Sequence, residues 1–116
     1  MPTVAKTFIS KWSSQVKKGT LEYIVLLLLA DKDQYGYELL GAIKECTSFE
    51  IAEGTIYPLL NRLKREGLIA SEWFEKESGV PRKYYTITEQ GLDTLKSMRH
   101  FWLELSQSIQ QMMLRT

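Results

Sequence analysis

The segment from residue 54 to residue 67 constrains the fold more than any other part of this sequence. Its apolar residues recur at i, i+3, i+4 and i+7, the spacing of a helix that buries one stripe, and they are Ile56, Leu59, Leu60 and Leu63. Gly67 follows the last of them, where glycine commonly ends a helix. The opposite face holds no acid and carries Gly54, Pro58, Asn61, Arg62 and Arg65, with Thr55 and Tyr57 on its flanks. The pattern predicts a helix that packs on a core and presents a basic face outward.

Two further helices are predicted before this segment. The first runs from about Thr7 to Ala30, with Gly19 as a weak point, and a polar loop over residues 31–34 follows it. Within it, the apolar run 21–30 is too short to span a bilayer core of about 30 Å, so we expect a buried helix and no membrane partner. The second helix begins near Tyr35 or Gly36 and ends near Thr47. Its apolar stripe consists of Leu39, Leu40, Ile43 and Cys46.

A β-hairpin is predicted after the basic helix. Residues 68–77 and 82–88 are rich in β-branched and aromatic side chains, and the turn-forming segment 78–81 separates them. Strand alternation turns Tyr85 and Ile87 toward the core and leaves Tyr84 as the more exposed ring. Thr88 is the expected N-cap of a last helix that extends to about Leu114.

The last helix contains a heptad seam that is long for so small a domain. Apolar residues recur at alternating steps of three and four over Leu95, Met98, Trp102, Leu105, Ile109 and Met112. A second helix is expected to pack along this seam. That helix is either the first helix of the same chain or a helix of a second copy, and the length of the seam favours a homodimer.

Composition restricts the function. With 116 residues, 44% of them hydrophobic, the chain is expected to form one compact unit with little room for a private catalytic cavity. The formal net charge is only +1, but the charges are segregated: residues 1–20 hold four lysines and no acid, residues 21–54 hold seven acids and two lysines, and residues 55–66 hold three bases and one acid. Near-neutrality therefore does not exclude a local basic surface.

The single cysteine and the single histidine offer no catalytic or metal-binding set. Cys46 has no disulfide partner, which predicts a cytoplasmic protein with a semi-buried thiol, and His100 is expected on a helix surface or at an interface. No catalytic residues, metal site or cofactor are expected.

The order of three helices, a hairpin and a final helix predicts a winged helix-turn-helix, mainly α with a small β-hairpin, in which the third helix enters the major groove of DNA. Residues 1–90 form this unit and residues 91–116 a dimerisation helix. Asn61 is suited to adenine, and Arg62 or Arg65 to guanine or a phosphate. In the hairpin, Arg82 and Lys83 are suited to phosphates, unless Glu75 and Glu77 pair with them.

Several motifs make the chain similar to the PadR family of bacterial transcriptional regulators, in particular its short subfamily with a single C-terminal helix. They are Gly19-Thr20-Leu21, Tyr35-Gly36-Tyr37-Glu38-Leu39, Gly54-Thr55-Ile56-Tyr57-Pro58-Leu59-Leu60, Glu66-Gly67-Leu68-Ile69 and Arg82-Lys83-Tyr84-Tyr85-Thr86-Ile87-Thr88. One departure is Ala52-Glu53, which stands where many relatives have Ser-Pro and leaves the third helix without a side-chain N-cap.

The resemblance implies a homodimeric repressor that binds a pseudo-palindromic operator through the third helix and the wing. By position it implies DNA contacts from Tyr37, Thr55, Tyr57, Pro58, Asn61, Arg82 and Lys83, to which the basic and aromatic pattern adds Arg62, Arg65 and Tyr84. The implied dimer interface uses Phe8, Trp12 and the six seam residues. Similar short members hold flat aromatic compounds between their C-terminal helices, which implies effector contacts from Trp102, Val16, Tyr23 and Phe101, with Leu95 and Met98 beside them. For Trp102, an ordinary interface role remains the alternative.

Two other functions remain in competition with DNA binding. A winged-helix module that binds a protein through its acidic second helix and aromatic wing would show no salt-dependent affinity for a duplex. An enzyme is the weaker alternative, because the sequence contains no nucleophile–base pair, metal constellation or phosphate loop.

Overall fold

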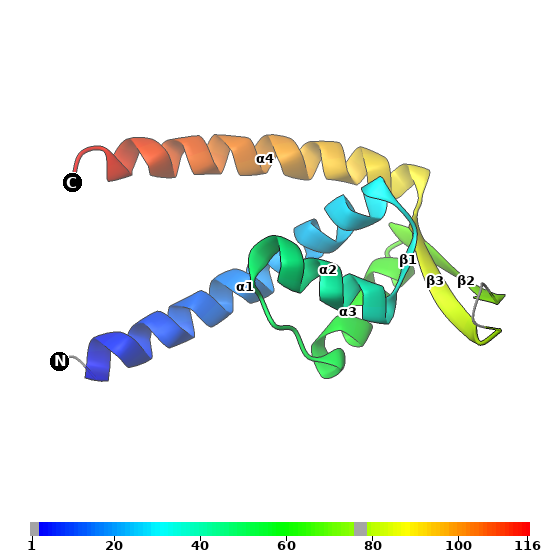
Figure 1. The fold of residues 1–116 in the computed structure, drawn as a ribbon. Helices are drawn as coiled ribbons and strands as arrows, with labels where there is room; N and C mark the ends of the chain where they lie inside the picture. The colour runs from blue at the N-terminus through cyan, green and yellow to red at the C-terminus, as the bar shows by residue number, and fades with distance from the viewer. Residues whose placement is uncertain (1–2, 76–78) are drawn as a thin grey trace.

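The computed structural model describes residues 3–75 and 79–116 of the chain. Within these ranges it contains four helices and a three-stranded antiparallel sheet (Figure 1). In chain order they are α1 (Thr3–Asp31), β1 (Gln34–Tyr35), α2 (Gly36–Thr47), α3 (Glu53–Arg65), β2 (Ile69–Glu75), β3 (Pro81–Ile87) and α4 (Glu89–Met113). The predicted class, mainly helical with a small β-hairpin, is confirmed. Glu77 and Ser78 lie outside the described residues.

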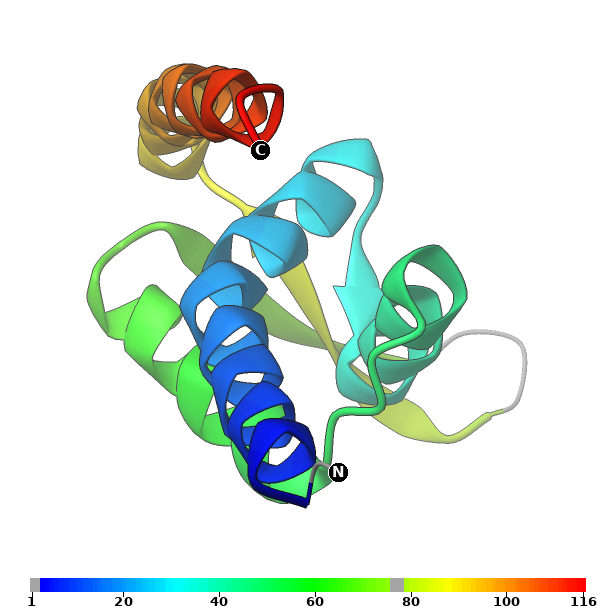
Figure 2. The same cartoon turned by 90° about the vertical axis from the view of Figure 1, so that its left-hand side faces the viewer.

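The core is built around the second half of α1. Figure 2 shows α1 in the middle, with α3 and α2 on either side of it and α4 above. The apolar stripe predicted for α3 is buried, since Ile56, Leu60 and Leu63 are at most 2% exposed and Leu59 is 8% exposed. It meets the apolar run of α1 and the buried residues of α2, the sheet and α4, which are Leu21, Val25, Leu26, Leu29, Leu39, Ile43, Ile69, Tyr85 and Leu95. Helix α1 runs through Gly19 without interruption.

The start of α3 lacks a side-chain cap, as the sequence predicts. Ala52 is its N-cap in extended conformation, and the carbonyl oxygen of Ala52 accepts hydrogen bonds from the amides of Thr55 (2.9 Å) and Ile56 (3.1 Å). Pro58 lies inside α3, and the helix continues past it to Arg65.

The sheet contains a strand that the sequence did not reveal. Strand β1 pairs with β3, so that Tyr35 lies opposite Tyr84, and the strand order is β1-β3-β2. The Tyr84 ring is covered by Tyr35, with ring centroids 5.3 Å apart, and by Phe74, with centroids 6.0 Å apart. Tyr84 is the more exposed of the two adjacent tyrosine rings, as predicted, at 8% against 3% for Tyr85. Both rings are nevertheless buried, because β1 supplies an aromatic cover on the outer face of the sheet.

A correction concerns the thiol. Cys46 is exposed rather than semi-buried, since it lies in the last turn of α2, after which Ser48 turns the chain in a left-handed conformation with φ of 66°.

The joint between the hairpin and α4 is closely packed. Thr88 is the N-cap of α4, as predicted: its hydroxyl accepts a hydrogen bond from the amide of Gly91 (3.0 Å) and donates one to the carbonyl of Gly67 (2.7 Å). A side chain at Gly91 would meet the Leu68 carbonyl oxygen, which fixes the position where α4 leaves the hairpin. Over the described ranges, no helix has the length and apolar character needed to cross a bilayer.

Candidate nucleic-acid interface

The outward face of α3 is exposed as the sequence predicts. Thr55, Pro58, Asn61 and Arg65 are all exposed, while the ring of Tyr57 is 37% exposed. Within the described residues, Arg65 forms no ion pair, so its charge is available to a ligand. Four buried side chains on the opposite side of α3 hold the helix against the core.

A groove of 610 Å³ lies between the start of α2, the face of α3 and the hairpin wing. It brings together five of the predicted DNA-contact residues, which are Tyr37, Tyr57, Asn61, Arg82 and Lys83. Tyr35, Gly36, Trp73, Pro81 and Tyr85 complete its lining. Thr55, Pro58 and Arg65 lie on the exposed α3 face beyond it.

The ring of Tyr57 lies directly against the backbone of α2. A Cβ atom added at Gly36 would be 2.5 Å from the Tyr57 hydroxyl, so glycine is required for the ring to hold this position. Burial raises the pKa of the neighbouring Tyr85 phenol, and the Tyr57 hydroxyl raises it further. The Tyr85 phenol therefore remains a neutral hydrogen-bonding group at physiological pH.

Each of the two wing cations lies over an aromatic ring. The guanidinium of Arg82 is 4.6 Å from the ring centroid of Tyr35 and donates a 2.9 Å hydrogen bond to its hydroxyl. The ammonium of Lys83 is 5.6 Å from the ring centroid of Trp73, which faces it across the hairpin. Among residues 3–75 and 79–116 neither cation forms an ion pair. Glu75 lies opposite Pro81 instead.

Tyr35 and Trp73 are groove residues that sequence reasoning missed. Trp73 could have been found from the sequence, because the register of the hairpin places it opposite Lys83. Tyr35 could not, since its position depends on the pairing of a two-residue strand with a segment far along the chain.

The structure gives Arg62 a partner inside the protein. Its guanidinium forms a 2.8 Å ion pair with Glu22 of α1, on the flank of α3 that faces α1. Arg62 therefore differs from Arg65, although both were predicted to contact DNA. On the other flank, Lys64 donates a 2.7 Å hydrogen bond to the Ser71 hydroxyl.

The α4 seam is covered only at its beginning. Leu95 is 3% exposed and Met98 packs against the core, but Trp102, Leu105, Ile109 and Met112 are between 40% and 53% exposed. Helix α1 diverges from α4 toward the two termini (Figure 1), and its own Phe8 and Trp12 are 65% and 53% exposed. The alternative in which α1 covers the whole seam is wrong.

An apolar pocket of 270 Å³ lies where the covered part of the seam ends. Thr20 and Tyr23 of α1 line it together with Thr94, Ser97, Met98, Phe101 and Trp102 of α4. The Tyr23 and Trp102 rings lie with centroids 5.9 Å apart at an interplanar angle of 44°. Three of the four predicted effector contacts line this pocket, and Val16 does not.

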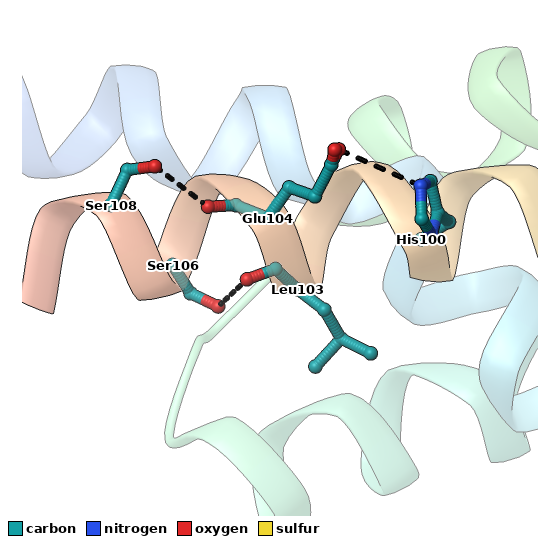
Figure 3. Close-up of polar contacts among 5 residues, drawn as sticks. All are labelled: His100, Leu103, Glu104, Ser106 and Ser108. Carbon is teal, nitrogen blue, oxygen red and sulfur yellow. Dashed lines mark hydrogen bonds and ion pairs between the residues drawn. The ribbon is translucent and has the colours of Figure 1, made fainter.

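Several polar side chains of α4 have partners within the same helix. Figure 3 shows His100 beside Glu104, 3.5 Å apart, and the Ser108 hydroxyl donating to the Glu104 carbonyl at 3.0 Å. The imidazole of His100 is 80% exposed, as expected for a histidine on a helix surface. In the part of the chain that the structure describes, no group of three or more His, Cys, Asp or Glu side chains is placed to hold a metal ion.

The chain is similar in sequence to known transcriptional regulators. The model of the transcriptional regulator PadR-like family matches residues 25–97. An uncharacterised protein of Lysinibacillus sphaericus is 36% identical over 98 residues, which cover 83% of this chain and 90% of that protein. The transcriptional regulator YqjI of Escherichia coli is 36% identical over 83 residues, and there the match spans only 38% of the regulator.

Solved structures agree along nearly the whole chain. A PadR family transcriptional regulator from Eggerthella lenta superposes with a TM-score of 0.81 at 32% identity, covering 96% of this chain and 93% of that one. A PadR-like transcriptional regulator from Bacillus cereus has a TM-score of 0.80 at 34% identity, covering 85% of this chain and 96% of that one.

Proposed function

Because the chain belongs to the PadR-like family of transcriptional regulators, we propose that it is a sequence-specific DNA-binding repressor that acts as a homodimer on a pseudo-palindromic operator. Regulators of this family bind DNA and are typically dimers. The observation that supports the proposal most directly is the groove that Asn61 of α3 lines together with the wing cations Arg82 and Lys83, neither of which forms an ion pair among the described residues. A regulatory rather than a catalytic role follows from the same family membership.

In this proposal the exposed face of α3 lies in the major groove of the duplex. Asn61 reads a base, because its amide matches the donor and acceptor pair on the major-groove edge of adenine. Arg65 contacts guanine or a phosphate, and Arg82 and Lys83 bind phosphates beside it. Tyr37, Tyr57, Thr55 and Pro58 supply the remaining contact surface. Arg62 and Tyr84 are not part of it, since the first is paired with Glu22 and the second is buried.

The uncovered part of α4 is the proposed dimer surface, and residues 91–116 form its dimerisation helix. A second copy would cover the exposed seam residues of α4 together with Phe8 and Trp12 of α1, which are all large apolar side chains. Two-fold symmetry then sets the two α3 helices one duplex turn apart, about 34 to 36 Å, or a simple multiple of that distance.

We further propose a flat aromatic effector for the pocket beside Trp102. The pocket is lined almost entirely by apolar atoms and opens next to the proposed dimer surface, so the second copy would enclose it. Candidate aromatic compounds should quench Trp102 fluorescence in the parent protein. The Trp102→Leu variant, which retains Trp12 and Trp73, supplies the background signal. Equal quenching of the two proteins would refute this effector site.

Selection of bound duplexes from random DNA tests the function directly, since it yields the operator and its half-site spacing together. On that operator, Asn61→Ala should weaken binding by about 1 to 3 kcal/mol while leaving affinity for random DNA unchanged. Lys83→Ala should weaken binding to both duplexes equally and lower the salt dependence. Lys44→Ala is the matched control, because Lys44 pairs with Glu50 (3.1 Å) outside the groove.

Two results would contradict the proposal. If Asn61→Ala lost the same affinity for operator and for random DNA, Asn61 would not read a base. No salt-dependent affinity for any duplex would favour a protein-interaction module instead, with the exposed Trp73 and Phe74 of the wing as its contact surface.

A further inference from the structure

Tyr35 has two contacts with Arg82 that together restrict the arginine side chain. The hydroxyl of Tyr35 accepts the 2.9 Å hydrogen bond from Nη1 of Arg82, and the guanidinium carbon lies 4.6 Å from the Tyr35 ring centroid. A hydrogen bond and a cation–π contact on one planar group leave it far fewer rotamers than a free arginine has.

Tyr35 is itself held in place, through its backbone by α2 and through its ring by the sheet. Its backbone is the N-cap of α2, and its amide donates a 3.1 Å hydrogen bond to the Glu38 carboxylate. Its ring meets the ring of the buried Tyr84 edge-on, with an interplanar angle of 75°. Tyr84 in turn rests against Phe74 of β2. Arg82 is therefore attached to a rigid support formed by α2 and the sheet.

This support leaves the positive charge of Arg82 unneutralised. Across the described ranges, no acidic side chain forms an ion pair with Arg82, and its partner Tyr35 offers a hydroxyl rather than a carboxylate. Arg82 and Tyr35 both line the groove that also contains Asn61 of α3. The wing thus presents an ordered cation toward the space that the proposed function assigns to DNA.

We infer that Tyr35 is a positioning residue, which holds Arg82 in its phosphate-binding orientation before DNA arrives. The inference rests on the proposed function, because it assumes that the ligand of the groove is a duplex. Its physical basis is entropic: an arginine that is free in solution loses rotamer freedom when it binds a phosphate, and an arginine that is already ordered loses much less. Among the residues that the structure describes, Lys83 has no equivalent anchor, since Trp73 offers it a ring 5.6 Å away and is itself 66% exposed.

Tyr35→Phe is the sharpest test, because it removes only the hydroxyl and keeps the ring contacts with Tyr84 and Arg82. We expect the operator affinity to fall about three- to tenfold per protomer. The salt dependence of binding should not change, because the number of cations that reach phosphates is the same. Arg82→Gln, by contrast, should reduce the slope of log K against log salt by about 0.9 for each lost contact. In the Arg82→Gln background, Tyr35→Phe should have no further effect.

A second measurement does not depend on DNA. In the free protein, the guanidinium protons of Arg82 should exchange with water several-fold faster in Tyr35→Phe than in the parent, as followed by arginine-selective NMR. Ser71→Ala is the matched control. It also removes a hydroxyl that holds a basic side chain, Lys64, but neither residue lines the groove, so it should alter neither affinity nor Arg82 exchange.

The outcomes separate this inference from the function on which it rests. A parent protein without salt-dependent duplex affinity would refute the proposed function, whatever Arg82 exchange shows. A parent that binds its operator, together with a Tyr35→Phe variant of equal affinity and equal Arg82 exchange, would overturn the positioning role. A loss in Tyr35→Phe that persists in the Arg82→Gln background would also overturn it, because Tyr35 would then act on the fold or on DNA directly.

Discussion

Replacing Gly91 by alanine tests whether the first turn of α4 is fixed against the hairpin. The new Cβ atom would lie 2.1 Å from the carbonyl oxygen of Leu68 and 2.7 Å from Cγ1 of Ile87. The nearest of these atoms belongs to the backbone, so a rotamer change alone cannot relieve the contact. The Leu68 carbonyl already accepts a 3.0 Å hydrogen bond from Thr88, and the Gly91 amide donates to the Thr88 hydroxyl. Moving either segment by the required distance therefore strains or breaks one of these bonds.

The expected loss of stability follows from these contacts. Overpacking costs about 1 to 3 kcal/mol, and a weakened N-cap adds about 1 kcal/mol. The better helix propensity of alanine returns at most about 1 kcal/mol. Gly91→Ala should thus lower the free energy of unfolding by about 2 kcal/mol.

Urea unfolding followed by far-UV circular dichroism measures this difference, at one fixed protein concentration because a dimer's stability depends on concentration. Gly41→Ala is the matched control. Gly41 lies inside α2, and an added Cβ atom there meets nothing within 4 Å. That variant should gain about 0.5 to 1 kcal/mol. If Gly91→Ala were as stable as the parent, α4 would not be seated against the Leu68 carbonyl.

Three shorter predictions address the charges and the seam. Arg65→Gln should weaken duplex binding and lower its salt dependence in gel-shift titrations. Arg62→Gln should leave the salt dependence unchanged and lower the free energy of unfolding by at most about 1 kcal/mol in urea, because it removes a partly exposed ion pair. Burial, and to a smaller extent Tyr57, raises the pKa of Tyr85, so the unfolded chain releases the phenol proton at lower pH than the folded protein does. The free energy of unfolding should therefore fall as the pH rises above about 10. In urea titrations, Tyr85→Phe should lose less stability than the parent between pH 9 and pH 11. Ile109→Glu should convert a dimer to monomers in sedimentation analysis without changing the helical content, and an unchanged sedimentation coefficient would contradict the proposed interface.

Hydrophobic periodicity was sufficient to predict the helices from the sequence, but it could not predict which residues line the groove. The stripe Ile56, Leu59, Leu60 and Leu63 predicted α3 correctly, because burial of one helix face is a local property of the sequence. Strand β1 was missed, since its two residues are held by pairing with β3 rather than by a pattern of their own. The same pairing buries Tyr84, which alternation alone placed outward.

The two arginines of α3 illustrate the remaining limit. A helical wheel places Arg62 and Arg65 on the same side of the helix, and only the tertiary structure shows that one of them faces Glu22 of α1. Local geometry decides which residues share a face, but a partner on another element decides which charges remain available. The sequence could therefore predict the basic face of α3 but not the difference between these two residues.

Near-neutral composition is compatible with DNA binding because the charges of this protein are not equivalent. Among the described residues, acids pair with two of its lysine and arginine side chains, Glu22 with Arg62 and Glu50 with Lys44. Arg65, Arg82 and Lys83 form no ion pair within the described residues and lie on the exposed α3 face or in the groove. Three phosphate contacts per protomer would give a slope of log K against log salt of about −2.7, and a dimer about −5.4. A single protomer would thus hold a duplex weakly at physiological salt. Tight binding to an operator then requires the α4 seam to join two such surfaces in fixed register.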